Sequence, residues 1–215
     1  MRKRDLIIVC AAVITAIALA AGIFGRQAVP TGAWGLNFRT EGVPPVGNVG
    51  TAQLKQYDAA YLGDASKQVI YLTFDDGPGP YTAKLLDILK QNDVKATFFV
   101  TMHYVKTQPD LVRRMINEGH TVGNHSVNHY SMPTLYIPKM ESEILGLHNY
   151  MIEKFGYTMT LFRPPKGEYS TRSLAVTQRL GYTTMHWSFA YKDWATNEQW
   201  SYNDALNHIV SCHHN

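Results

Sequence analysis

The chain has few cysteines and few charged residues. Its 215 residues include only two cysteines, Cys10 and Cys212, which are too few for a disulfide framework. Charged residues make up 17% of the chain, and three basic residues and one acidic residue among the first five supply +2 of the formal net charge of +3. Because the remainder has no clusters of lysine and arginine, the composition argues against a nucleic-acid-binding protein.

The chain also has no internal repeat, no low-complexity tract and no H-E-x-x-H sequence. Because H-E-x-x-H is a zinc-binding motif of metalloproteases, its absence makes a metalloprotease a weak hypothesis. Apolar residues make up 45% of the chain, which excludes a disordered or collagen-like protein. The length fits one ordinary domain with some residues to spare, or two very small domains.

A long apolar run lies close to the N-terminus. Residues 6–25 form 20 consecutive positions without a charge, and Arg2, Lys3 and Arg4 precede them. At about 1.5 Å of rise per residue such a helix spans a bilayer core, and the positive-inside rule places the rest of the chain outside the cytoplasm. We therefore expect residues 1–25 to be a signal-anchor in the cell membrane. The alternative is a signal peptide cleaved near Ala20, which would make the protein secreted.

Residues 26–66 show no sustained periodicity and contain three prolines. This composition predicts a linker that leaves the membrane and wraps onto a domain formed by residues 67–215, with Trp34 and Leu36 as anchors in a surface groove. A mobile tether is the other interpretation of the same composition.

Strand and helix patterns alternate from residue 69 onward. Apolar runs rich in β-formers predict strands at 69–74, 96–100, 121–123, 161–162 and 183–187. Helical spacing of apolar residues predicts helices at 81–91, 109–118, 138–155, 170–180 and 203–210. The alternation indicates an α/β fold with a parallel sheet, either open or closed into a barrel.

Polar residues follow the ends of these predicted strands, which is where active sites lie in α/β folds. They are Asp75 and Asp76, His125 and His129, Arg163, and Asp193 with Trp194. The i, i+4 spacing of the two histidines, joined by one carboxylate, suits a catalytic metal with open coordination positions. Taken singly, the histidines fit surface residues and the aspartates fit a turn, but their common place at strand ends favours a site.

Four segments of the chain resemble, in order, the four motifs of the polysaccharide deacetylase family, also called the NodB-homology fold or carbohydrate esterase family 4. They are Thr73–Pro78, His125–His129, Arg163–Gly167 and Asp193–Trp194. The resemblance implies a distorted (β/α) barrel and metal-dependent hydrolysis of an N-acetyl group on an amino sugar.

The resemblance also implies a role for each matched residue. Asp76, His125 and His129 would hold the metal, and Asp75 would be the general base. Arg163 would orient Asp75, Asp193 would be a supporting residue near the catalytic acid, and Trp194 would line the acetyl pocket. The backbone N–H of Lys166 would help to hold the oxyanion. We expect zinc, although cobalt, nickel, iron or manganese would accept the same ligands.

A narrower resemblance is to the peptidoglycan N-acetylmuramic acid deacetylases that prepare muramic δ-lactam in the spore cortex. It rests on residues 34–35, 44–45, 57–64, 119–126, 162–170 and 187–194. That subgroup commonly lacks the second aspartate of the first motif, whereas this chain has Asp76. The departure leaves open a chitooligosaccharide or peptidoglycan N-acetylglucosamine deacetylase, so the expected partner is peptidoglycan or another N-acetylated glycan.

The sequence departs from the family pattern at its C-terminus. The family ends with an apolar strand that carries a Leu-His motif, whose histidine is thought to protonate the leaving amine. Here His213 and His214 follow the last predicted helix without such a strand. We therefore expect a truncated domain and poor deacetylation. One edge of the strand at 69–74 should be unpaired or be covered by residues 26–67. A protein of another class, an inactive fragment that binds glycan or metal, is the alternative.

Overall fold

The computed structural model describes residues 31–38, 42–77, 79–190, 193–195 and 197–211. The apolar run at 6–25, both cysteines, His213 and His214 lie outside these residues, so the expectations that concern them stay predictions. Within the described part, none of the helices combines the length and apolar character that a membrane crossing requires.

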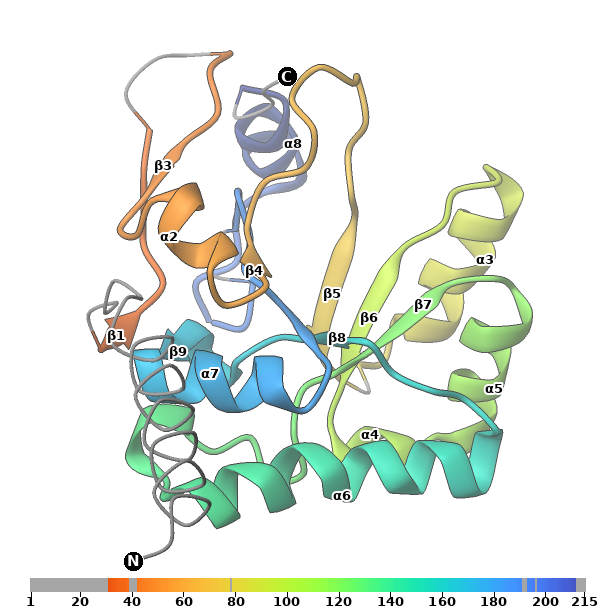
Figure 1. The fold of residues 1–215 in the computed structure, drawn as a ribbon. Helices are drawn as coiled ribbons and strands as arrows, with labels where there is room; N and C mark the ends of the chain where they lie inside the picture. The colour runs from red at the N-terminus through yellow and green to blue at the C-terminus, as the bar shows by residue number, and fades with distance from the viewer. Residues whose placement is uncertain (1–30, 39–41, 78, 191–192, 196, 212–215) are drawn as a thin grey trace, which may run out of the picture.

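The main sheet has six strands, and all of its pairings are parallel (Figure 1). In spatial order the strands are β4 (Ala59–Ala60), β10 (Thr183–Met185), β8 (Leu161–Phe162), β7 (Thr121–Asn124), β6 (Thr97–Val100) and β5 (Thr73–Asp76). The sheet curls into part of a barrel, which confirms the predicted fold class. Among the described residues β4 and β5 are the two edges, and neither pairs with the other.

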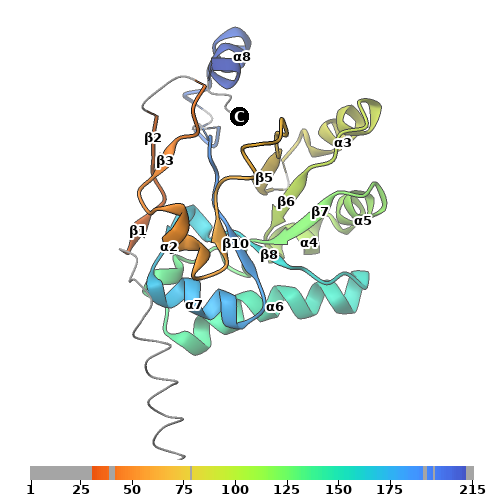
Figure 2. The same cartoon turned by 45° about the horizontal axis from the view of Figure 1, so that its top comes forward.

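Helices cover the outer side of the curled sheet (Figure 1). They are α3 (Thr82–Gln91), α4 (Met102–Thr107), α5 (Pro109–Asn117), α6 (Ile137–Phe155) and α7 (Thr171–Arg179). α8 (Tyr202–Ser211) has no buried residue and stands away from the sheet (Figure 2). The short elements are β1 (Gly32–Ala33), β2 (Leu36–Asn37), β3 (Val46–Gly47), α2 (Thr51–Lys55), β9 (Glu168–Tyr169), and the 3₁₀ turns η1 (Met132–Thr134) and η2 (Pro165–Gly167).

The core between the sheet and the helices follows the predicted periodicity of α6. Met140, Ile144, Leu147 and Met151 are at most 1% exposed, and the helix ends at Gly156 with φ of 63°. Fully burying an apolar side chain of this size stabilises a fold by about 1.5–3 kcal/mol. The repeated burial on one face therefore explains why this long helix docks where it does.

The segment before residue 67 packs on the domain. Trp34, Leu54, Tyr57 and Tyr61 form a second core with Tyr169 of β9. The same segment supplies β4, whose residues pair with β10 in the main sheet. Residues 32–37 and 46–61 thus form a wrap rather than a mobile tether.

The strand predicted at 69–74 is shifted along the chain. β5 begins at Thr73, whereas Val69, Ile70 and Tyr71 are 52%, 75% and 69% exposed and lie outside any strand. The strand was predicted at 69–74 because those residues are apolar. Its actual bounds are set by pairing with β6, which spans Thr73 to Asp76. Of the two alternatives for its edge, β5 shows the unpaired one: among the described residues β6 is its one strand partner, and the N-terminal segment pairs with β10 instead.

Candidate metal centre and active site

The carboxyl ends of three parallel strands of the main sheet bring the candidate residues together. β5 ends with Asp75 and Asp76, β7 runs directly into His125, and β8 runs directly into Arg163. Because the strands are parallel, these ends meet at one edge of the sheet. The sequence motifs therefore converge in space as predicted.

Asp76, His125 and His129 form a cluster with the spacing of a metal centre. Oδ1 of Asp76 lies 3.2 Å from Nε2 of His129 and 3.5 Å from Nε2 of His125, and one ligand atom from each residue lies within 4.8 Å of the others. Two ligands that each sit about 2.1 Å from a tetrahedral centre are about 3.4 Å apart. The donor set and its spacing therefore fit a divalent cation.

The hydrogen bonding of His125 fixes which nitrogen faces the cluster. Its Nδ1–H donates to the carbonyl oxygen of Arg163 at 2.7 Å, which leaves the Nε2 lone pair directed at Asp76. Burial lowers the pKa of His125 although Asp75 and Asp76 oppose this effect. The imidazole is thus held neutral and oriented, which is the form that ligates a metal.

Three residues of the cluster region adopt a left-handed backbone that non-glycine residues rarely adopt. Asp76, Ser126 and His129 have φ of 62°, 72° and 55°. Such residues cost of the order of 1–3 kcal/mol each and persist only where their surroundings hold them. Here Oδ1 of Asn124 accepts the Ser126 N–H at 2.9 Å, and Oγ of Ser126 accepts the His129 N–H at 3.0 Å.

Arg163 holds Asp75 beside the cluster. Nη1 of Arg163 donates to Oδ1 of Asp75 at 2.7 Å and to the hydroxyl of Thr73 at 2.8 Å. On the other side the guanidinium donates to the carbonyl oxygens of Met185 and His186 at 3.1 Å and 3.4 Å. With its side chain 3% exposed, the arginine has a fixed position, and Asp75 is oriented by it as predicted.

The remaining predicted residues, Asp193, Trp194 and Lys166, are exposed. Partial burial raises the pKa of Asp193, and the charges of Asp75 and Asp76 act in the same direction, so this carboxyl lies within electrostatic reach of both. Trp194 is 71% exposed, and Lys166 is exposed at the turn η2 with φ of 59°. Their roles at the acetyl group and the oxyanion stay predictions.

His186 has a place at the site that its spacing in the sequence does not reveal. Its ring stacks on the Trp34 indole with centroids 4.6 Å apart, and its carbonyl oxygen accepts from Arg163. Burial lowers the pKa of His186 to about 3, so the ring is neutral. Trp34 donates from Nε1 to the carbonyl oxygen of Trp187 at 2.8 Å, and the wrap thereby supports the backbone that holds Arg163.

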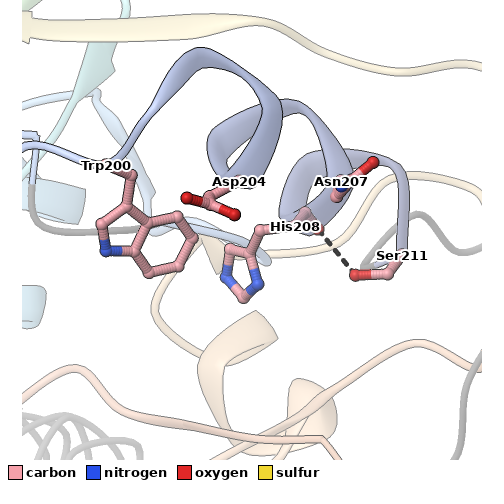
Figure 3. Close-up of a pocket in the computed structure, with 5 residues that line it drawn as sticks. All are labelled: Trp200, Asp204, Asn207, His208 and Ser211. Carbon is pink, nitrogen blue, oxygen red and sulfur yellow. Dashed lines mark hydrogen bonds between the residues drawn. The ribbon is translucent and has the colours of Figure 1, made fainter.

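A shallow hollow of about 520 Å³ lies along α8 (Figure 3). Its lining consists of Trp200, Asp204, Asn207, His208 and Ser211. The lining contains one carboxylate and one histidine, and it includes none of the residues predicted for the site. The predicted catalytic and metal-binding residues therefore lie at the strand ends and not in this hollow.

A curled parallel sheet that presents a cation-binding cluster next to an arginine-held carboxylate defines a metal-dependent hydrolase. Residues 62–185 match the profile of a family described as polysaccharide deacetylase. The chain belongs to this family, and it is a deacetylase, a hydrolase that acts on carbon–nitrogen bonds.

Relatives extend the similarity beyond the matched region. The chain is 39% identical over 210 residues to the peptidoglycan-N-acetylmuramic acid deacetylase PdaA of Bacillus subtilis, which covers 95% of this chain and 80% of that protein. The solved structure of B. subtilis PdaA, a family 4 carbohydrate esterase, superposes with a TM-score of 0.81 over 86% of this chain and 82% of that one. A peptidoglycan-N-acetylglucosamine deacetylase of Bacillus cereus is 34% identical over 142 residues, or 66% of this chain and 52% of that protein.

Proposed function

We propose that this protein removes the acetyl group from N-acetylmuramic acid residues of peptidoglycan. The observation that carries the proposal is the Asp76–His125–His129 cluster beside an arginine-held Asp75. It occurs in a chain similar over 95% of its length to a deacetylase of that substrate.

Each residue has a distinct task in amide hydrolysis. The cation would be held by Asp76, His125 and His129. When bound, it would lower the pKa of a water molecule and polarise the carbonyl group of the substrate. Asp75 accepts the proton of the attacking water at a carboxylate oxygen, and the bond from Arg163 keeps that carboxylate aimed at the cluster. Asp193 supports the acid step, the backbone N–H of Lys166 holds the oxyanion, and Trp194 covers the acetyl group.

The setting of the reaction is part of the proposal. The apolar run at 6–25 behind three basic residues supports a membrane anchor, with the catalytic domain on the outer side of the cytoplasmic membrane. Zinc is the proposed cation, since two imidazoles and one carboxylate with open positions suit it. Muramic δ-lactam formation in the spore cortex is the proposed context.

Deacetylation of N-acetylglucosamine is the second candidate. It is favoured by the presence of Asp76 and by similarity to the B. cereus enzyme, but that similarity covers 52% of the relative, against 80% for the muramic acid deacetylase. The shorter match makes N-acetylmuramic acid the better-supported substrate.

The test is acetate release by the full chain from glycan strands that alternate the two sugars, with mass spectrometry to identify the deacetylated residue. We expect loss of acetyl groups from the muramic acid. Chitooligosaccharides offer N-acetylglucosamine alone, and release from them but not from muramic acid would contradict the proposal. A chain that binds zinc yet releases no acetate from either substrate would instead be the inactive binding protein.

A further inference from the structure

A carboxylate is buried in the apolar face of α6. The side chain of Glu143 is 1% exposed, and it sits among the buried residues Met140, Ile144 and Leu147. Burying a charged group destabilises a fold unless the charge is paired and hydrogen-bonded. A role for this position therefore depends on what its oxygens contact.

The oxygens of Glu143 contact the loop that joins the two histidines of the metal cluster. Oε2 accepts the backbone N–H of Asn128 at 2.7 Å, and Oε1 accepts the Nδ2 group of the same asparagine at 2.8 Å. The main-chain carbonyl oxygen of Glu143 accepts the N–H of Val127 at 3.1 Å. One helical residue thus binds two successive loop residues through three hydrogen bonds.

The loop also packs directly against α6. A Cβ added to Gly146 would lie 2.9 Å from Cγ2 of Val127, which is closer than real contacts allow. Gly146 is one turn after Glu143, so the glycine admits the loop where the glutamate binds it. Packing and hydrogen bonding therefore locate the loop on the same face of the helix.

The loop needs such support because of its backbone. Ser126 and His129 both have positive φ, and His129 belongs to the candidate metal cluster. Without external bonds, rotation of these residues toward ordinary values would separate the two imidazoles. The bonds to Glu143 hold the residues that lie between them.

We propose that Glu143 is the positioning residue of the metal centre, which fixes the distance between His125 and His129 by clamping Asn128 and Val127 onto α6. The proposal rests on the metal site of the proposed function and adds a residue from outside the four motifs.

The charge state of Glu143 is consistent with this role. Burial by itself would raise the pKa of Glu143, but hydrogen bonds from Lys139 and Asn128 outweigh burial and lower it. Lys139 Nζ lies 2.8 Å from Oε1. The carboxylate is therefore ionised at neutral pH and accepts all of its hydrogen bonds.

The test compares Glu143→Gln with Glu141→Gln in the full chain. Both changes remove one negative charge from α6, but Glu141 pairs with the exposed Arg179 instead of the loop. In Glu143→Gln an amide N–H₂ group replaces one carboxylate oxygen and faces a donor. Cobalt affinity is measured by competition with a chelator, and the cobalt absorption spectrum reports the geometry of the ligands.

We expect Glu143→Gln to weaken cobalt binding by up to about 10-fold and to change the spectrum. Direct partners of ligating residues typically contribute about 10–100-fold, and Glu143 acts one step further out, through the loop residues between the two histidines. Glu141→Gln should match the wild type within about twofold. Affinity and spectrum equal to the wild type in a folded Glu143→Gln protein would overturn the proposal.

A second variant covers the case in which Glu143→Gln does not fold. Asn128→Ala removes the Nδ2 bond from the exposed loop and leaves the buried glutamate and its lysine in place. We expect a smaller loss of cobalt affinity in the same direction, and no loss would count against the proposal. The proposed metal site itself would fail if the wild type bound no cobalt, or if His125→Ala bound it equally well. The proposal for Glu143 would fail alone if His125→Ala lost cobalt affinity while the Glu143 and Asn128 variants kept it.

Discussion

The two halves of the site are held in different ways. His125 and Arg163 follow the interior strands β7 and β8, and their side chains are each 3% exposed. Asp75 and Asp76 end the edge strand β5, and their side chains are 29% and 59% exposed. The interior half is positioned by packing and by several hydrogen bonds to carbonyl oxygens, whereas the edge half is positioned by the pairing of β5 with β6 and by the ion pair of Asp75 with Arg163.

This difference matches the demands of the chemistry. A ligand and a guanidinium that must keep one orientation benefit from burial, because close packing leaves few alternative rotamers. A general base must reach water and substrate, so it has to lie where solvent has access. An edge strand supplies that access, and the salt bridge from Arg163 supplies the orientation.

The largest effect is expected at the exposed half. Asp75→Asn keeps the shape of the side chain but removes the proton acceptor, so kcat for acetate release should fall about 10²–10⁴-fold. Cobalt affinity should stay within a few-fold, since the ligands are unchanged. Asp87→Asn, an exposed aspartate that pairs with Arg114, serves as the control. Near-full activity of Asp75→Asn would mean that another group is the base.

Arg163→Lys tests the dependence of the exposed half on the buried half. A single ammonium group cannot reproduce the bonds of the guanidinium to Asp75, Thr73 and two carbonyl oxygens. A misplaced base should lower kcat by about 10²-fold with a smaller change in KM. Arg179→Lys on the surface should change neither parameter. If Arg163→Lys kept its kcat, the salt bridge would not orient the base.

The buried half should be sensitive to acid. The pKa of His186 is about 3 in the folded chain, so below the ordinary value near 6.5 the unfolded chain binds a proton that the folded chain does not. Stability is therefore full above about pH 6.5 and declines as the pH falls, by about 1.4 kcal/mol per unit. Burial shifts the pKa of His120 and His125 in the same direction.

His186→Phe should remove its share of this decline. Between pH 7.5 and pH 5.0 the variant should lose about 2 kcal/mol less unfolding free energy than the wild type, measured by urea denaturation. Among the residues that the structure describes, neither ring nitrogen of His186 has a hydrogen-bond partner, so the replacement removes no bond seen there. The exposed His103→Phe is the control. Equal losses in wild type and His186→Phe would show that the ring is protonated in the folded state.

The smallest effect is expected before the edge strand. Ile70 is 75% exposed, so Ile70→Thr should change the unfolding free energy by less than about 0.5 kcal/mol. The same change should reduce self-association in light scattering, because exposed apolar residues beside an unpaired strand promote aggregation. A destabilisation above about 1 kcal/mol would instead mean that residues 69–72 are packed in solution.

Sequence patterns predicted the elements whose signal is local. The apolar spacing of α6 and its terminal Gly156 depend on residues within the helix itself, and both were located within one residue. The motifs at strand ends were brought together as predicted because parallel strands align their carboxyl ends. These features require no knowledge of distant contacts.

Other features depend on contacts that no local pattern contains. Ala59 and Ala60 are weak strand formers, and they become β4 because β10 offers them a partner. Likewise, β5 lies at Thr73–Asp76 instead of the predicted 69–74, because those are the residues that pair with β6. Glu143 offered one usable signal, a glutamate inside an apolar stripe, but its partner Asn128 is 15 residues away in sequence and is visible only in the fold.

The position of β4 has a consequence for how this domain can be exchanged between proteins. The family profile begins at residue 62, yet the strand that completes the sheet beside β10 and the indole that covers His186 both come earlier in the chain. The segment that builds the domain therefore begins before the segment that the family profile matches. A chimaera joined at residue 62 would exchange the catalytic motifs without this support, whereas a junction before Gly32 would carry Trp34 and β4 together with the motifs.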